Sequence, residues 1–360
     1  MAIDFPVERW QKIKEESRLW WAGKLKRPLI QVVLNGAPPD RPEPKANSPD
    51  KNKTVYDLSI TSEELIDRWD YELSGRRWLG DGLPHVFVDF GPGVIAALLG
   101  ARPEPRMESV WFQAVKDQPI ADVQLRYDPD NVWFRRLKDI YRAGIDRWQG
   151  RALMSMTDLG GNLDILSSFR PGEGLLLDLY DHPEVVKRLT WQAHHLWWRY
   201  FDEFNAILQP VNPGYSAWAS LYSDVPFYML QCDFCYMLGP EMFDEFVLPE
   251  LTATCKRLGN AFYHLDGVGQ LAHLDKLLKI PELKGIQWVP GAGKPVQADW
   301  PEVLRKVRDA GKLIQLGGNF ATMDKLVRDL GSPEGILLIC HAKIDQQPQY
   351  EECLRKYGAT

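Results

Sequence analysis

Short apolar runs alternate with helix-like stretches along most of this chain of 360 residues, and this alternation limits the folds that it can adopt. Residues 29–34, an apolar run ended by Asn35-Gly36, show the first buried-strand pattern. Further strands are predicted at residues 86–89, 152–158, 215–222, 227–233, 261–264, 285–289, 313–316 and 336–340. Strands that alternate with helices form parallel sheets joined by crossover helices. With roughly eight such strands and no GxGxxG turn after the first, the pattern favours an α/β fold of the (β/α)8 barrel type over a doubly wound sheet.

Helical periodicity fills the stretches between these strands. Helices are predicted at residues 5–26, 61–70, 130–148, 183–207, 240–258, 271–278, 300–310 and 323–330. Pro249 lies inside one of them and predicts a kink or break, while Ser62 is the expected N-cap of another. Residues 37–53 are predicted as an exposed loop because they are rich in Pro, Asp, Lys and Asn. We expect one barrel domain over residues 1–360, in which residues 1–80 supply N-terminal helices, the first strand and this loop.

Several predicted strands end in a polar residue followed by glycine. The motifs are Asp89-Phe-Gly, Asp158-Leu-Gly, Asp266-Gly, Gly291-Ala-Gly and Gly317-Gly-Asn319. In a barrel these positions lie at the carboxyl ends of the strands, where the active sites of this fold are found. The pattern therefore predicts an enzyme whose site is lined by these residues.

Composition excludes several other classes of protein. The 43 basic and 49 acidic residues give a net charge of −6, which argues against nucleic-acid binding. The sequence contains no run of 18 apolar residues, so it predicts no membrane span. The stretch MAIDFPVERW lacks the pattern of a signal peptide. Five cysteines are too few for a disulfide framework in a chain of this length, and Cys232-Asp-Phe-Cys235 is predicted as two buried thiols. We expect a cytoplasmic protein.

Three segments resemble one enzyme superfamily. Residues 236–250, YMLGPEMFDEFVLPE, are similar to the ISPEMFxEFVLP stretch of the uroporphyrinogen decarboxylase superfamily, which also contains the methylcobamide:coenzyme M methyltransferases. Residues 174–186 resemble its LLxDLYDxPExV helix entry, and residues 90–100 with Val110-Trp111 match one branch. The resemblance extends over about residues 80 to 345 and implies a (β/α)8 barrel.

The methyltransferase branch of this superfamily depends on zinc held by a His-x-Cys motif and by a second cysteine near the C-terminus. This chain has His264 and Asp266 at the first motif and Cys340 as the candidate for the second. The resemblance therefore implies a zinc site on His264, Asp266 and Cys340, with three protein ligands and one open position. Because a carboxylate replaces a thiolate, the metal would be a harder Lewis acid that favours an oxygen ligand, or a different metal.

The activity that the resemblance implies is transfer of a methyl group between a small methylated substrate, a corrinoid and an acceptor. The chain has no Asp-x-His-x-x-Gly motif, so the corrinoid would be free or carried by a partner protein. Asp89 matches the pocket-facing aspartate of the decarboxylases and is expected to act in catalysis or to cap a turn. The remaining residues expected to face the substrate are Asp233, Asp158, Trp218, Tyr222, Trp288 and Asn319.

Two other functions stay open. Uroporphyrinogen decarboxylase grips its substrate's carboxylates with N-terminal arginines, and residues 28–36 have none. A metal-independent lyase acting on a smaller acid would instead use Asp89 or the His264–Asp266 pair to move protons. A barrel that only binds a corrinoid or tetrapyrrole is the third hypothesis. The pairs Trp20-Trp21 and Trp197-Trp198 are packing residues or, if exposed, an interface in a homodimer.

Overall fold

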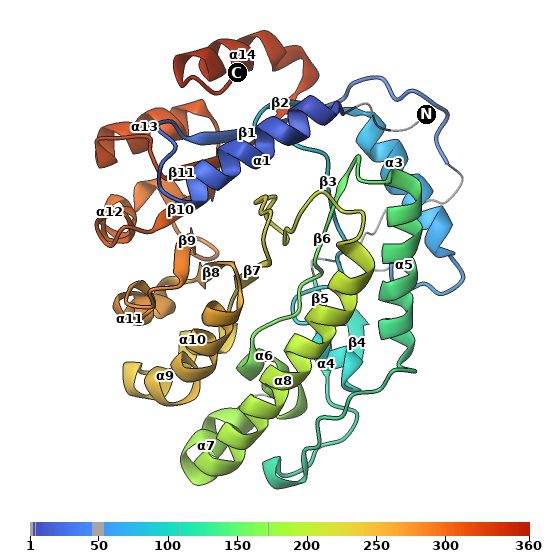
Figure 1. Cartoon of the computed structure of the whole chain (residues 1–360). Coiled ribbons are helices and arrows are strands. Elements are labelled where there is room, and N and C mark those ends of the chain that lie inside the picture. The colour runs from blue at the N-terminus through green and yellow to red at the C-terminus, as the bar shows by residue number, and fades with distance from the viewer. Residues whose placement is uncertain (1–2, 4, 45–53, 108, 172) are drawn as a thin grey trace.

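The computed structural model describes residues 3, 5–44, 54–107, 109–171 and 173–360. They form a mixed α/β fold in which strands lie at the centre and helices surround them (Figure 1). The largest sheet has seven strands, in the order β2 (Arg76–Gly80), β1 (Leu29–Asn35), β11 (Ile336–Lys343), β10 (Leu313–Gly317), β9 (Leu283–Val289), β8 (Asn260–Asp266) and β7 (Phe227–Leu230).

The parallel strands belong to two separate ladders. From β1 round to β7 all neighbours are parallel, and β3 (His85–Phe87) and β6 (Leu153–Ser155) form a second parallel pair. Within the described residues these ladders do not close into a barrel, because β2 pairs antiparallel with the free edge of β1. Beside β6 the predicted strand 215–222 is irregular, with one bridge between Tyr215 and Ser223. The backbone of this stretch bonds to the end of β6 through Met156 N and Ser216 O.

The predicted helices are present with shifted ends. They are α1 (Val7–Trp21), α3 (Ser62–Ser74), α5 (Val132–Trp148), α8 (Pro183–Leu208), α9 (Pro240–Phe246), α10 (Leu248–Arg257), α11 (Leu274–Leu278), α12 (Pro301–Asp309) and α13 (Phe320–Leu330). The helices α4 (Ile95–Leu98), α6 (Asn162–Phe169), α7 (Gly174–Asp181) and α14 (Gln347–Lys356) were not predicted. The predicted break at Pro249 is confirmed, because α9 and α10 are separate helices. The N-cap of α3 is Thr61 rather than Ser62, since Thr61 and Glu64 form a reciprocal capping box.

Three strands were not predicted. They are β2 and the hairpin of β4 (Arg102–Pro105) and β5 (Val110–Gln113), which lacks a simple alternation of apolar and polar residues. Of the predicted loop 37–53, residues 45–53 lie outside the described residues. The rest of that loop has no helix or strand.

Alternation along the strands produces an apolar layer that is covered by α1. Side chains on the inner face form a cluster with Trp20 and Trp21, which contact the rings of Phe262 and Phe227. Two residues further along the strands, the same face carries the polar side chains of His264 and Gln315. The candidate site therefore lies above an apolar floor, toward the carboxyl ends of the strands.

Among the described residues, none of the helices is long and apolar enough to cross a membrane.

Replacing Trp20 with alanine tests whether α1 stabilises the apolar layer below the candidate site. Trp20 is 1% exposed, so Trp20→Ala should lower the free energy of unfolding by about 3–5 kcal/mol. Urea denaturation followed by circular dichroism measures the change. Leu19→Ala is the matched control on the same helix, because Leu19 is 44% exposed and should cost far less. Equal losses in the two variants would contradict this account of the packing.

Candidate functional site

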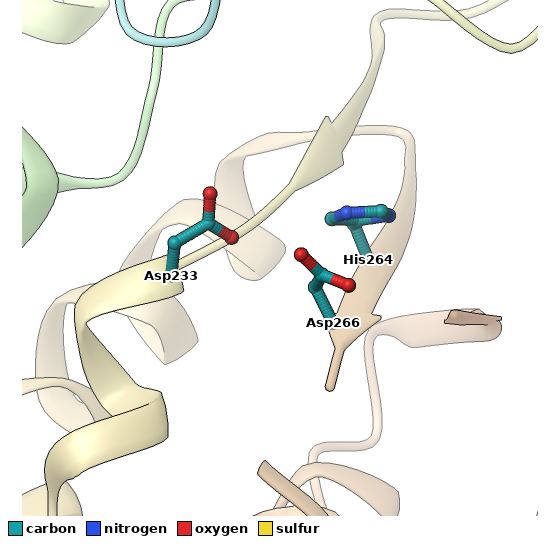
Figure 2. Close-up of side chains that lie close together, drawn as sticks. All are labelled: Asp233, His264 and Asp266. Atoms are coloured by element: carbon teal, nitrogen blue, oxygen red, sulfur yellow. The ribbon is translucent and has the colours of Figure 1, made fainter. Parts of the chain in front are cut away.

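Three side chains of the kinds that bind metal ions lie close together at the carboxyl ends of the strands. His264 and Asp266 share one face of β8 because they are two residues apart, and Asp233 begins the helical turn that follows β7. One nitrogen or oxygen atom from each residue lies within 4.8 Å of those of the other two. Figure 2 shows the three side chains converging on one space. Such a group has the composition of a metal-binding site.

A row of polar side chains fixes the orientation of His264. Its Nδ1 donates to Gln287 Oε1 on β9 at 2.5 Å, and Gln287 Nε2 donates to Gln315 Oε1 on β10 at 2.5 Å. An amide oxygen only accepts, so Nδ1 carries the proton and Nε2 keeps its lone pair. Trp218 packs edge-on against the imidazole, with ring centroids 5.7 Å apart. His264 is thus held as a neutral ring with one nitrogen free to bind a cation.

The surroundings shift the pKa values of two members of the group in opposite senses. Desolvation lowers the pKa of His264, although Gln287 and Asp266 act against this shift. Desolvation raises the pKa of Asp233 to about 8, and the negative charges of Asp164, Asp266 and Asp158 raise it further. A bound cation would relieve the repulsion between these carboxylates.

Asp164 is a site residue that the sequence analysis missed. Its carboxylate accepts hydrogen bonds from the backbone N–H groups of Asp233 (3.1 Å) and Phe234 (2.8 Å), and also from Gly161 (3.1 Å). These bonds hold the turn that carries Asp233. An aspartate in the first turn of α6, after the glycine pair, was the available signal, because such residues often bond to backbone N–H groups.

Asp158 holds the loops around the site in place by hydrogen bonds. It is not a member of the group formed by Asp233, His264 and Asp266. Its Oδ1 accepts hydrogen bonds from Gly160 N (2.8 Å), Gly93 N (3.3 Å) and Gln231 Nε2 (3.0 Å). Burial raises its pKa to about 7. A Cβ atom on Gly160, whose φ is +77°, would lie 2.6 Å from the Cα atom of Gly93, so this close contact requires glycine.

The structure does not bring Cys340, the third predicted metal ligand, into the group of Asp233, His264 and Asp266. It is fully buried on β11 among apolar side chains. Desolvation raises its pKa to about 12, and a smaller effect comes from Cys353 of α14. The side chain thus lies on the α14 side of the strand, whereas its neighbour His341 lines a cavity at the strand ends. Asp233 takes the third position instead.

Three residues expected to face the substrate have structural roles. Tyr222 is 4% exposed and its hydroxyl donates to Pro213 O at 2.8 Å. Trp288 is 1% exposed and packs against Trp300, on the helical side of β9. Asn319 caps α13 by accepting a hydrogen bond from Thr322 N. These contacts give Tyr222, Trp288 and Asn319 structural roles, and none of the three belongs to the metal-binding group of described residues.

Asp89 both caps a turn and faces a cavity. Its Oδ1 accepts from Gly91 N at 2.8 Å, and it lines a cavity of about 360 Å³ with His85 and Trp218. The two roles weighed for it are therefore compatible. Trp218 also lines this cavity and contacts His264, and its contact with a substrate stays a prediction.

Two larger cavities flank the group. A cavity of about 590 Å³ lies beside Asp233 and is lined in part by Trp111, Phe112 and Asp164. A cavity of about 560 Å³ lies on the side of Gln287 and Gln315. Cys232 and Cys235, between β7 and α9, are buried free thiols as predicted.

Comparison with known proteins identifies no family for this chain. No protein-family model matches the chain, and no curated protein matches it. Among solved structures, bee venom hyaluronidase in complex with a hyaluronic acid tetramer has a TM-score of 0.34 at 9% identity, over 77% of this chain and 86% of that one. Macrophomate synthase has a TM-score of 0.24 at 13% identity, over 63% and 73%. Scores this low carry no argument about fold or function.

The polar row predicts how His264 titrates in the metal-free protein. Its pKa should lie below the ordinary value of 6.5, and Gln287→Leu should lower it further because the Gln287 carbonyl stabilises the protonated ring. Histidine side-chain NMR over a pH series measures both values, with His264→Gln identifying the signal. A pKa above 6.5 would show that Asp266 outweighs burial and would contradict the description of a neutral ring.

Proposed function

We propose that this chain is an enzyme built on a barrel-like arrangement of its parallel strands, with a divalent metal ion bound by Asp233, His264 and Asp266. The observation that carries the proposal is the convergence of these three side chains within 4.8 Å. The orientation of His264 by Gln287 supports it, because a metal-binding histidine usually donates its other N–H group to a fixed partner.

The donor set fits a borderline or hard divalent ion. One imidazole nitrogen and two carboxylates suit zinc, iron or manganese, and three protein ligands leave a position open for substrate. When bound, such an ion polarises a substrate oxygen or sulfur and lowers its pKa. With Cys340 outside the group, no thiolate is among the three candidate ligands, so the site favours a substrate oxygen.

The reaction that we propose is methyl transfer between a small methylated compound, a corrinoid and an acceptor. It rests on the resemblance of residues 174–186 and 236–250 to the uroporphyrinogen decarboxylase superfamily, which contains corrinoid methyltransferases, with the corrinoid supplied by a partner protein. An acceptor loses a proton to the solvent as its heteroatom takes the methyl group. Asp233 would take part in its ionised form, as one of the three metal ligands. Trp218 would orient the acceptor beside His264.

The elevated pKa of Asp233 favours a second candidate, a metal-independent lyase. Near neutral pH a carboxyl with a pKa of about 8 stays mostly protonated and can act as a general acid. The ionised carboxylate of a neighbour such as Asp266 would then bind or orient the substrate. The metal content of the protein separates the two candidates, because a lyase of this kind is indifferent to chelators.

Elemental mass spectrometry of the purified protein tests the metal site. We expect about one divalent ion per chain, with at least about tenfold weaker binding in Asp233→Asn, His264→Ala and Asp266→Asn. Cys340→Ala is the control, since Cys340 lies outside the group and should keep the metal. A parent protein that stays empty after incubation with zinc, iron or manganese would overturn the metal proposal. Loss of metal in Cys340→Ala at unchanged stability would restore that residue as a ligand.

Methyl transfer is tested with free methylcobalamin. The metal-loaded protein should change the cobalamin absorbance in the presence of a small alcohol or thiol acceptor, and His264→Ala should abolish the change. A metal-loaded protein that leaves methylcobalamin unchanged with every acceptor would remove the support for this reaction while leaving the metal site intact.

Metal affinity should depend on pH through Asp233. This carboxyl must lose its proton to bind a cation, and its pKa in the metal-free protein is about 8. The apparent affinity should therefore rise about tenfold per pH unit from about pH 6 to about pH 8. Competition with a chelator of known affinity measures the slope. Asp233→Asn should bind more weakly with a flatter profile, and an equally steep profile in that variant would assign the proton to another group.

A further inference from the structure

The cavity of about 560 Å³ beside the metal centre has a distinctive lining. It touches Gln287 and Gln315, which orient His264, and Trp218, which contacts the imidazole ring. Its other polar side chains are those of Arg76, His85, His341 and Ser220. No carboxylate is present among the described residues of this lining, in contrast to the acidic group next to it.

Arg76, from β2, is the charged residue of this cavity. The structure gives its half-buried guanidinium no hydrogen bond or ion pair with any described residue. Desolvation lowers its pKa, and the carboxylate that opposes the shift, Glu72, is bonded to Arg68 at 3.2 Å. The guanidinium of Arg27, in contrast, bonds to the carboxylates of Asp81 and Glu16. A guanidinium that is partly removed from water and has no acceptor among the described residues favours an anionic partner.

Two imidazoles flank this guanidinium. His85 Nε2 lies 3.0 Å from Ala217 O and donates to it, which fixes the ring, and burial lowers the pKa of His85 to about 4. His341 lies on β11, next to Cys340 and on the opposite face of the strand. The charge of Arg76 acts on both rings, which places them close to it. His341 can supply a second hydrogen-bond donor to a ligand in the cavity.

We propose that this cavity binds an oxyanionic group of the substrate, a carboxylate or a phosphate, through bidentate hydrogen bonds from Arg76. The substrate class is then a small molecule with an oxyanion at one end and a metal-binding oxygen at the other, which reaches the metal centre past Trp218. This orientation rests on the proposed function. Binding of the anion itself does not, because the cavity contains none of the three metal-binding residues.

Isothermal titration of the metal-free, full-length protein with inorganic phosphate and with succinate tests the anion site. At least one should bind saturably, and the stronger of the two identifies the class of oxyanion. Arg76→Gln should weaken that binding at least about tenfold, and Arg76→Lys should weaken it less, because lysine keeps the charge but loses the fork geometry.

Arg77→Gln is the matched control. Arg77 is the next residue on β2, its side chain is exposed, and it bonds to the backbone oxygens of Ser74 and Arg76 outside this cavity. It should bind the anion like the parent protein. Absence of saturable binding of both anions in the parent protein, or equal losses in Arg76→Gln and Arg77→Gln, would overturn the proposal.

Failure of the metal proposal is distinguishable from failure of the anion site. Asp266→Asn should lose the metal and keep the anion, whereas Arg76→Gln should keep the metal and lose the anion. A parent protein that binds phosphate or succinate but no metal leaves the anion site standing and removes the metal centre. If Arg76→Gln unfolds, as circular dichroism would show, Arg76→Lys decides the outcome through its smaller loss of affinity.

Discussion

The hydrogen-bonded row from His264 through Gln287 to Gln315 is the interaction on which the site depends. These side chains lie on one face of three neighbouring strands, directly above the apolar layer that Trp20 and Trp21 close. Polar groups in such a place must bond to one another, because they are cut off from water. That requirement fixes the tautomer and direction of His264. It therefore leaves one nitrogen of His264 free to bind the proposed metal ion. It also forms the wall between the group of Asp233, His264 and Asp266 and the neighbouring cavity of about 560 Å³.

The crowding of carboxyl groups around His264 is the second constraint on the structure of the candidate site. Asp158, Asp164, Asp233 and Asp266 are near enough for their charges to interact. Backbone N–H groups satisfy Asp158 and Asp164, which lets these two residues hold loops in place. Among the described residues, no hydrogen bond is donated to the carboxylate of Asp233, and the charges of Asp164, Asp266 and Asp158 raise its pKa. The loop residues thus form a frame that holds this carboxyl beside His264 and Asp266.

The sequence predicted most strands and helices because their apolar periodicity reflects burial directly. It also predicted that His264 and Asp266 share a face, which follows from their spacing. It failed where the direction of a side chain depended on tertiary packing. Cys340 and His341 are adjacent at a strand end, and packing of α14 against β11 decides which one faces the cavity. Arg76 lies on an edge strand without a clear alternating pattern, and the open ladder between β1 and β3 depends on that same strand.

The two halves of the site oppose each other in charge, and this opposition narrows the chemistry. On one side carboxylates and a neutral imidazole attract a cation, and on the other Arg76 attracts an anion. A neutral or purely cationic substrate would leave the guanidinium uncompensated. A substrate with an oxyanion at one end would satisfy Arg76 and bring its other end to an open coordination position. Since the three ligands offer nitrogen and oxygen but no sulfur, that other end is best matched by an oxygen. The charge pattern and the donor set therefore point to the same kind of molecule by independent physical arguments.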